Sequence, residues 1–137
     1  MSVYIDTSAL YAVLDHDDQY HTAAKASWRN LLQEDVPLIS SNYVLIEASA
    51  LIQRRLGQKA LQVFLEDIVS VLQIQWVDES IHRAAVQMIL RGRSRSLSLV
   101  DCTSFVVMRQ LGLNMAFTYD KHFQLQGFRC LGREPQK

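Results

Sequence analysis

Four acidic residues stand where carboxylates from distant parts of the chain could act together. Asp6 follows the apolar run 3–5, Glu47 borders an apolar helical stripe, and Asp101 and Asp120 stand at expected helix starts. Gathered in one crevice, four carboxylates would repel each other, and burial would raise their pKa values further. Mg²⁺ or Mn²⁺ removes that conflict, because hard cations prefer carboxylate and water oxygens. Such a metal can orient a water, lower its pKa and neutralise a phosphate under attack.

Each acid also has a purely structural interpretation. Asp6 and Asp120 can cap helices, since Asp side chains accept hydrogen bonds from free N–H groups at a helix start. Ser98 and Asp101 have the spacing of a capping box, with Asp in place of the usual Glu. Glu47 fits a half-exposed boundary residue. No single acid decides between the two interpretations, and the argument for a metal site depends on all four sharing one crevice.

The elements that would position these acids alternate between short β-like runs and helical patterns. Strands are predicted over 2–5, 36–40, 72–77 and 114–119, with an edge strand over 128–131. Helices are predicted over 8–15, 20–33, 41–56, 58–69, 79–91 and 97–112. The sequence therefore predicts one α/β domain over 1–137, with a central, mainly parallel sheet of four to five strands flanked by helices on both faces, and a mobile tail over 130–137.

In open parallel sheets, ligands bind beyond the carboxyl ends of the strands. Asp6 and Asp120 lie at that end of the first and fourth predicted strands. Two carboxylates from opposite ends of the chain are therefore expected at one edge of the sheet. Trp28 and Trp76 sit in apolar patterns and are predicted to lie in the core.

Composition is that of an ordinary globular protein, with 49% hydrophobic and 20% charged residues in 137. No apolar stretch approaches the roughly 20 residues that span a membrane. The amino terminus shows no signal-peptide pattern. Cys102 and Cys130 have no metal-type spacing and are interpreted as reduced thiols. These features lead us to expect a cytoplasmic protein that does not contact a membrane.

Four segments resemble the acidic motifs of the PIN domain family, in that family's order: VYIDTSALYAVLD, SNYVLIEASAL, LSLVDCTSFVVM and AFTYDKHF. The segment DQYHTAAKASW is similar to the start of the family's second helix. The chain most resembles the small single-domain members, the VapC-type toxins of prokaryotic toxin–antitoxin pairs. The resemblance covers nearly the whole chain, and the four motifs in order are specific although each alone is weak.

The resemblance implies a metal-dependent endoribonuclease with RNA as its substrate. Asp6, Glu47, Asp101 and Asp120 match the family's acidic quartet and would hold one or two Mg²⁺ or Mn²⁺ ions. Three hydroxyl residues would orient the carboxylates or a water: Thr7, Ser8 and Thr118. The resemblance further implies a homodimer and a cognate antitoxin that blocks the acidic site.

The segment RGRSRS, with Arg91, Arg93 and Arg95, directly precedes the third acidic motif. Residues 1–87 hold 11 acids and 6 bases, whereas residues 88–137 hold 3 acids and 8 bases. A solvated loop remains one interpretation. A basic rim that holds RNA phosphates beside a repulsive acidic centre is the other, and the position of the segment favours it.

Two rival enzyme classes fit less well. A haloacid-dehalogenase-type phosphatase needs a second Asp two positions after the first, where this chain has Ser8; a response-regulator receiver needs adjacent acids, where Thr7 follows Asp6. A non-catalytic PIN scaffold that binds RNA or a partner protein is the alternative of a different class. Acids at all four positions argue against it.

Overall fold

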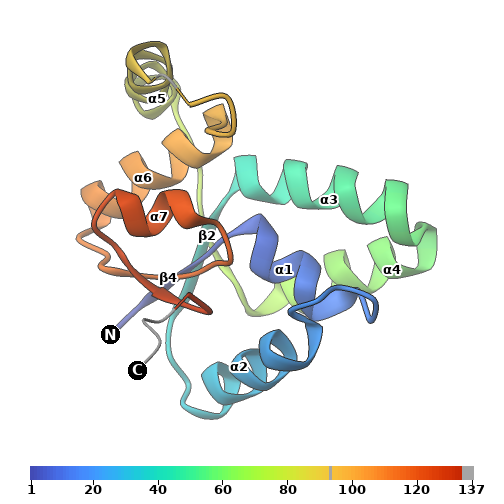
Figure 1. Ribbon diagram of the computed structural model, residues 1–137. Helices are drawn as coiled ribbons and strands as arrows, with labels where there is room; N and C mark the ends of the chain where they lie inside the picture. The colour runs from blue at the N-terminus through green and yellow to red at the C-terminus, as the bar shows by residue number, and fades with distance from the viewer. Residues whose placement is uncertain (93, 134–137) are drawn as a thin grey trace.

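A five-stranded parallel sheet forms the centre of the molecule (Figure 1), in a computed structural model that describes residues 1–92 and 94–133. The strand order is β3-β2-β1-β4-β5, and every neighbouring pair is parallel. The strands are short: β1 Val3–Ile5, β2 Leu38–Ser41, β3 Gln73–Gln75, β4 Met115–Phe117 and β5 Arg129–Leu131. The predicted α/β fold with a parallel sheet is confirmed.

Seven α-helices connect the strands within the described residues. They are α1 Thr7–Leu14, α2 His21–Gln33, α3 Asn42–Leu56, α4 Gln58–Val63, α5 Glu79–Arg91, α6 Leu99–Leu111 and α7 Lys121–Leu125. Figure 1 shows α6 and α7 on one side of the sheet and α1, α2 and α4 on the other. Covering both faces of a parallel sheet buries its central strands, which explains the continuous apolar run of β1.

The core is built around β1, the central strand, whose three residues are fully buried. The Tyr4 hydroxyl is 2.7 Å from the Ser104 hydroxyl on α6, so a buried polar atom is satisfied inside the core. Next to it, the Phe123 ring packs edge-on against Phe105 with ring centroids 4.9 Å apart. These contacts attach α6 and α7 to the strand that ends at Asp6.

Several element boundaries differ from the prediction. The helix predicted over 58–69 is α4 followed by a π-helical turn, Phe64–Ile68, and a 3₁₀ turn, Val69–Val71. Residues 121–125, over which no helix is predicted, form the short helix α7. Asp18 precedes α2, and its carboxylate accepts from the N–H of Tyr20, one residue before the helix. Helix ends are the least predictable feature of a sequence because several side chains compete for the same free N–H groups.

The prediction that Trp76 lies in the core is wrong. Its side chain is 69% exposed, whereas Trp28 packs against the core. The chain leaves the sheet after β3, and the N–H of Val77 donates to the side chain of Asn42 at 2.7 Å. This bond leads the chain toward α5, so Trp76 falls on a connection between β3 and α5 instead of on a strand face.

The predicted tail over 130–137 begins inside the sheet. Cys130 and Leu131 belong to β5 and pair with Ala116 and Phe117 of β4. Residues 134–137 lie outside the described residues. None of the helices in the described part of the chain is both long and apolar enough to cross a membrane.

Gly132 closes the turn after β5 and provides a test of how this edge is packed. Its φ is +104°, and an added Cβ would lie 2.9 Å from the carbonyl oxygen of Thr118 and 2.9 Å from the Tyr119 ring. We expect Gly132→Ala to lower the free energy of unfolding by about 2–4 kcal/mol, through backbone strain plus a steric clash. Gly112→Ala is the matched control, because Gly112 also has positive φ, in the left-handed helical region, but no atom within 4 Å of an added Cβ. It should cost only about 1–2 kcal/mol. Urea unfolding of both variants measures the difference, and equal losses would contradict the packing described here.

Candidate active site

Asp6 lies at the carboxyl end of the central strand and is 3% exposed. Its side chain caps α1, and one carboxylate oxygen, Oδ2, receives all of its hydrogen bonds from the described residues. The donors to Oδ2 are the Ser8 hydroxyl at 2.8 Å, the Thr118 hydroxyl at 2.9 Å and the Ser8 N–H at 3.4 Å. The other oxygen, Oδ1, accepts no hydrogen bond from this part of the chain, so it remains available as a ligand.

In Asp101 and Asp120, as in Asp6, one carboxylate oxygen caps a helix and the other is left for a ligand. Asp101 completes the predicted capping box at the start of α6, where its Oδ2 accepts from the N–H of Ser98 at 3.1 Å. Asp120 caps α7 through Oδ1, which accepts from the N–H of His122 at 2.9 Å. In the described structure the second oxygen of each carboxylate accepts no hydrogen bond. The predicted caps are confirmed, and capping leaves a coordinating oxygen on each residue.

Glu47 differs from the other three acids because it caps nothing. It is half-buried on the second turn of α3, and its carboxylate makes no hydrogen bond within the described residues. It faces a groove between α1 and α3 that Thr7 also lines. Its carboxylate is therefore free to bind a ligand through both oxygens.

Asp6 lies within electrostatic range of each of the other three carboxylates. Burial raises the pKa of Asp6 from 3.8 to about 6; the charges of Asp120 and Glu47 add to the increase, and the hydrogen bonds from Ser8 and Thr118 oppose it. Burial raises the pKa of Asp101 to about 7, and the charges of Asp6 and Asp120 contribute in the same direction. The fold therefore gathers acidic side chains at one edge of the sheet. No basic side chain contributes to the pKa shift of Asp6 or Asp101.

The donor set fits a hard divalent cation, although it does not form a finished coordination sphere. Among the described residues, no three acidic, histidine or cysteine side chains converge closely enough to hold a metal ion. The carboxylates do have free oxygens, and the pKa of two of them is raised by burial and mutual repulsion. A divalent cation would offset both effects, and rotation of the free side chains would bring further oxygens onto it.

Two of the three predicted hydroxyl residues join the acidic segments. The Ser8 hydroxyl lies 3.3 Å from that of Thr118 and also accepts from the N–H of Tyr119 at 2.9 Å. The Thr118 hydroxyl accepts from the N–H of Asp120 at 3.0 Å. Since both hydroxyls donate to Asp6, they connect the ends of β1 and β4. Thr7 is different, because its Oγ1 is buried and has no hydrogen-bond partner among the described residues.

The basic segment lies between α5 and α6. Arg91 ends α5 and Arg95 follows in the loop, both exposed, while Arg93 lies outside the described residues. The loop is attached to α7 by a bond that the sequence did not predict: the Ser96 hydroxyl lies 2.8 Å from Nε2 of His122. His122 is 7% exposed and lies in α7, so this bond is partly buried.

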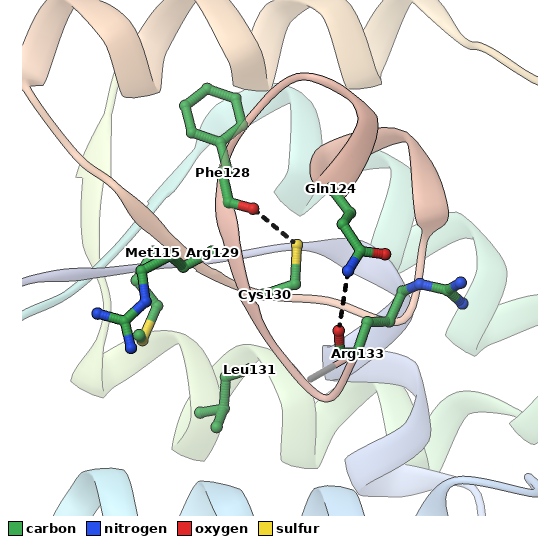
Figure 2. A pocket seen from close by; sticks show the side chains of 7 residues that line it. All are labelled: Met115, Gln124, Phe128, Arg129, Cys130, Leu131 and Arg133. Atoms are coloured by element: carbon green, nitrogen blue, oxygen red, sulfur yellow. Dashed lines mark hydrogen bonds between the residues drawn. The ribbon is translucent and has the colours of Figure 1, made fainter. Parts of the chain in front are cut away.

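A separate hollow of about 420 Å³ lies at β5, and none of the four acids lines it. Figure 2 shows that the side chains of Arg129 and Arg133 point in opposite directions. The Cys130 thiol donates to the carbonyl of Phe128, and the side-chain amide of Gln124 donates to that of Arg133. These groups do not converge on a shared point, so we place the candidate site at the acids.

Comparison with known proteins assigns the fold. The family model described as "PIN domain" matches residues 3–128. The chain belongs to the PIN domain family. This PIN domain is 31% identical over 127 residues to the 23S rRNA-specific endonuclease VapC20 of Mycobacterium tuberculosis, a match that covers 92% of this chain and 95% of the relative.

Solved structures agree with this assignment. The crystal structure of M. tuberculosis VapC20, described as a Sarcin-Ricin loop cleaving toxin, superposes with a TM-score of 0.83 at 30% identity and covers 98% of this PIN domain and 100% of that chain. Rickettsia felis VapBC2, bound to a promoter DNA fragment, gives a TM-score of 0.69 at 11% identity, covering 96% and 98%. At 11% identity, the similarity to VapBC2 supports only the assignment of the fold.

The raised carboxyl pKa values predict how stability depends on pH without metal. The folded protein keeps protons on Asp6 and Asp101 at pH values where the unfolded chain has lost them, so stability should fall as pH rises from about 4 to about 7. Between pH 5.5 and 7.5 in EDTA we expect a loss of roughly 2–3 kcal/mol, most of it from Asp101.

Urea unfolding at the two pH values measures this loss. Asp101→Asn should remove most of the pH dependence and Asp6→Asn a smaller part, because Asn can keep the cap but does not ionise. Asp78→Asn, at the exposed cap of α5, is the control and should leave the pH dependence unchanged. The same pH dependence in all three variants would contradict the prediction.

Proposed function

We propose that this PIN domain is a metal-dependent endoribonuclease that hydrolyses RNA phosphodiester bonds, and that it is the toxin of a type II toxin–antitoxin pair. The observation that carries the proposal is the state of Asp6: it is buried, held through one oxygen and repelled by neighbouring acids. A carboxylate in that state is suited to binding a cation. The similarity to an RNA endonuclease over 92% of the chain supplies the substrate class.

Asp6, Glu47, Asp101 and Asp120 would hold one or two Mg²⁺ or Mn²⁺ ions. The bound metal would supply a water of lowered pKa and neutralise charge on the phosphate under attack. The chain's own contribution is to hold the ligands in place: Ser8 and Thr118 fix one oxygen of Asp6 and thereby the direction of the other. The scissile phosphate would lie over the free oxygens, with its 3′ oxygen as leaving group.

VapC20 is described as cleaving the Sarcin-Ricin loop of 23S rRNA, so we propose structured ribosomal RNA as the first substrate to test. A cognate antitoxin follows from the toxin assignment. It would block the acidic site, and a homodimer would place two such sites along one groove. These partners would act in the cytoplasm.

A non-catalytic scaffold that binds RNA or a protein is the second candidate. It would keep the fold but would not need four carboxylates with free oxygens at one sheet edge. Cleavage of labelled RNA with Mn²⁺, measured with and without chelator, separates the two.

Removing one carboxylate charge tests the metal site apart from the caps. We expect Asp6→Asn, Asp101→Asn, Asp120→Asn and Glu47→Gln to leave the metal-free protein as stable as the wild type or more stable at pH 7.5, because a repelling charge is gone. Each should lose most of the rise in melting temperature that Mn²⁺ gives the wild type, since a ligand stabilises in proportion to its occupancy. RNA cleavage should fall by at least about 100-fold in each.

Thermal melts in EDTA and in Mn²⁺, with a cleavage assay, measure both effects. Asp78→Asn removes a charge from a cap outside the site and should behave as the wild type in both assays. Full Mn²⁺ shifts and normal cleavage in the four variants would show that these acids serve only as caps and a helix-boundary residue.

The exposed arginines at the end of α5 and in the loop that follows should contact RNA phosphates. We expect replacing Arg91 and Arg95 by Ala to reduce the slope of log Kd against log salt by about 0.7 for each phosphate that the variant no longer binds on single-stranded RNA. Lys25→Ala, on the exposed face of α2, is the control for charge. Fluorescence anisotropy at several salt concentrations gives the slope, and a double variant with the wild-type slope would identify a merely solvated loop.

A further inference from the structure

A groove between α1 and α3 begins at the acidic site and has a basic side chain at its other end. Its volume is about 360 Å³, and it is lined by Thr7, Glu47, Ala50, Leu51 and Arg54. The α3 residues of this lining follow helical spacing, so they form one stripe that faces α1. Arg54 is seven residues, or about 10 Å, beyond Glu47 along the helix axis.

Arg54 makes no ion pair or hydrogen bond within the described residues, and its side chain is exposed. The adjacent Arg55 is held instead, with its guanidinium 5.6 Å from the centre of the Tyr11 ring. Two arginines in one helical turn thus have different surroundings. Of these two, only Arg54 presents an unpaired cation to the groove.

Thr7 supplies an independent observation in the same groove. The residue is 6% exposed, lines the groove beside Glu47, and its hydroxyl Oγ1 is buried with no hydrogen-bond partner among the described residues. Buried hydroxyls are nearly always hydrogen-bonded, and an unsatisfied one costs on the order of 1–3 kcal/mol. A rotation of the Thr7 side chain that turned Oγ1 toward the groove would let a ligand oxygen provide the missing partner.

We propose that this groove binds the RNA backbone beyond the scissile bond, with Arg54 on a phosphate and the Thr7 hydroxyl on an oxygen of the strand close to Glu47. The proposal rests on the proposed function for its ligand. It gives the substrate a path, because the basic α5–α6 loop and Arg54 would hold the strand at two separate points with the acids between them. Such contacts position RNA without reading its sequence.

RNA binding without cleavage is the direct test. A fluorescein-labelled hairpin RNA is titrated in EDTA, and Kd is measured at several salt concentrations for the wild type, Arg54→Ala and Thr7→Val. We expect Arg54→Ala to weaken binding about 3- to 10-fold and to lower the salt slope by about 0.7. Thr7→Val should weaken binding without changing the slope, because it removes a hydroxyl and no charge.

Two controls separate binding from structure. Arg55→Ala removes the same charge in the same helical turn, outside the groove lining, and should keep the wild-type salt slope. Thr7→Val should be as stable as the wild type or more stable in urea, because the hydroxyl that it removes has no partner among the described residues of the free protein. A loss of RNA binding that comes with a loss of stability would identify a structural role and overturn the proposal for Thr7.

The outcomes distinguish this inference from the proposed function. If the wild type neither binds the hairpin in EDTA nor cleaves it in Mn²⁺, the ribonuclease assignment fails and the groove inference fails with it. If the wild type binds and cleaves while Arg54→Ala and Thr7→Val bind equally well at the same slope, only the groove inference is overturned.

Discussion

The organisation of this PIN domain follows from one constraint: Asp6 is a carboxylate at the end of the most buried strand. Withdrawal from water raises its pKa to about 6, so the fold must supply donors that favour the charged form. Ser8 and Thr118 meet that need from opposite ends of the chain, 110 positions apart. The ends of β1 and β4 are thus joined by the same bonds that hold the carboxylate. Repulsion from the other acids remains, and it is the electrostatic reason to expect a cation.

A cap and a metal ligand are not exclusive roles in this site. From sequence, each Asp could be interpreted either as a helix cap or as a ligand. In the structure Asp6 and Asp120 are the N-cap residues of α1 and α7, and Asp101 completes the capping box of α6. Each accepts these backbone hydrogen bonds through one oxygen. The cap fixes the carboxylate plane, which sets the direction of the second oxygen. Helix starts at the carboxyl ends of parallel strands therefore suit metal-binding acids, because the backbone orients the side chain before any ion arrives.

The fold was predictable because its signals are local. The apolar run of β1, the acids at helix starts and the glycines after α3 and α6 each lie within a few residues of the element that they define. The features that sequence did not reveal depend on partners distant in the chain. His122 is buried where it contacts Ser96, 26 positions away in the sequence. Trp76 is exposed because the hydrogen bond from Val77 to Asn42 turns the chain away from the sheet. Arg54 gave no signal in sequence, since only the packing of α1 against α3 places it in a groove with Thr7.

The strand order has a consequence for how the sequence can vary. The two edge strands, β3 and β5, supply none of the four acids, which come from the ends of β1 and β4 and from α3 and α6. Substitutions within these two strands reach the carboxylates only through neighbouring elements, whereas a change along β1 displaces Asp6 directly. A chain of this design can diverge at its periphery and retain its chemistry. The residues around the edge strands can therefore change, and with them the surface that contacts a substrate, while the central strands stay the same.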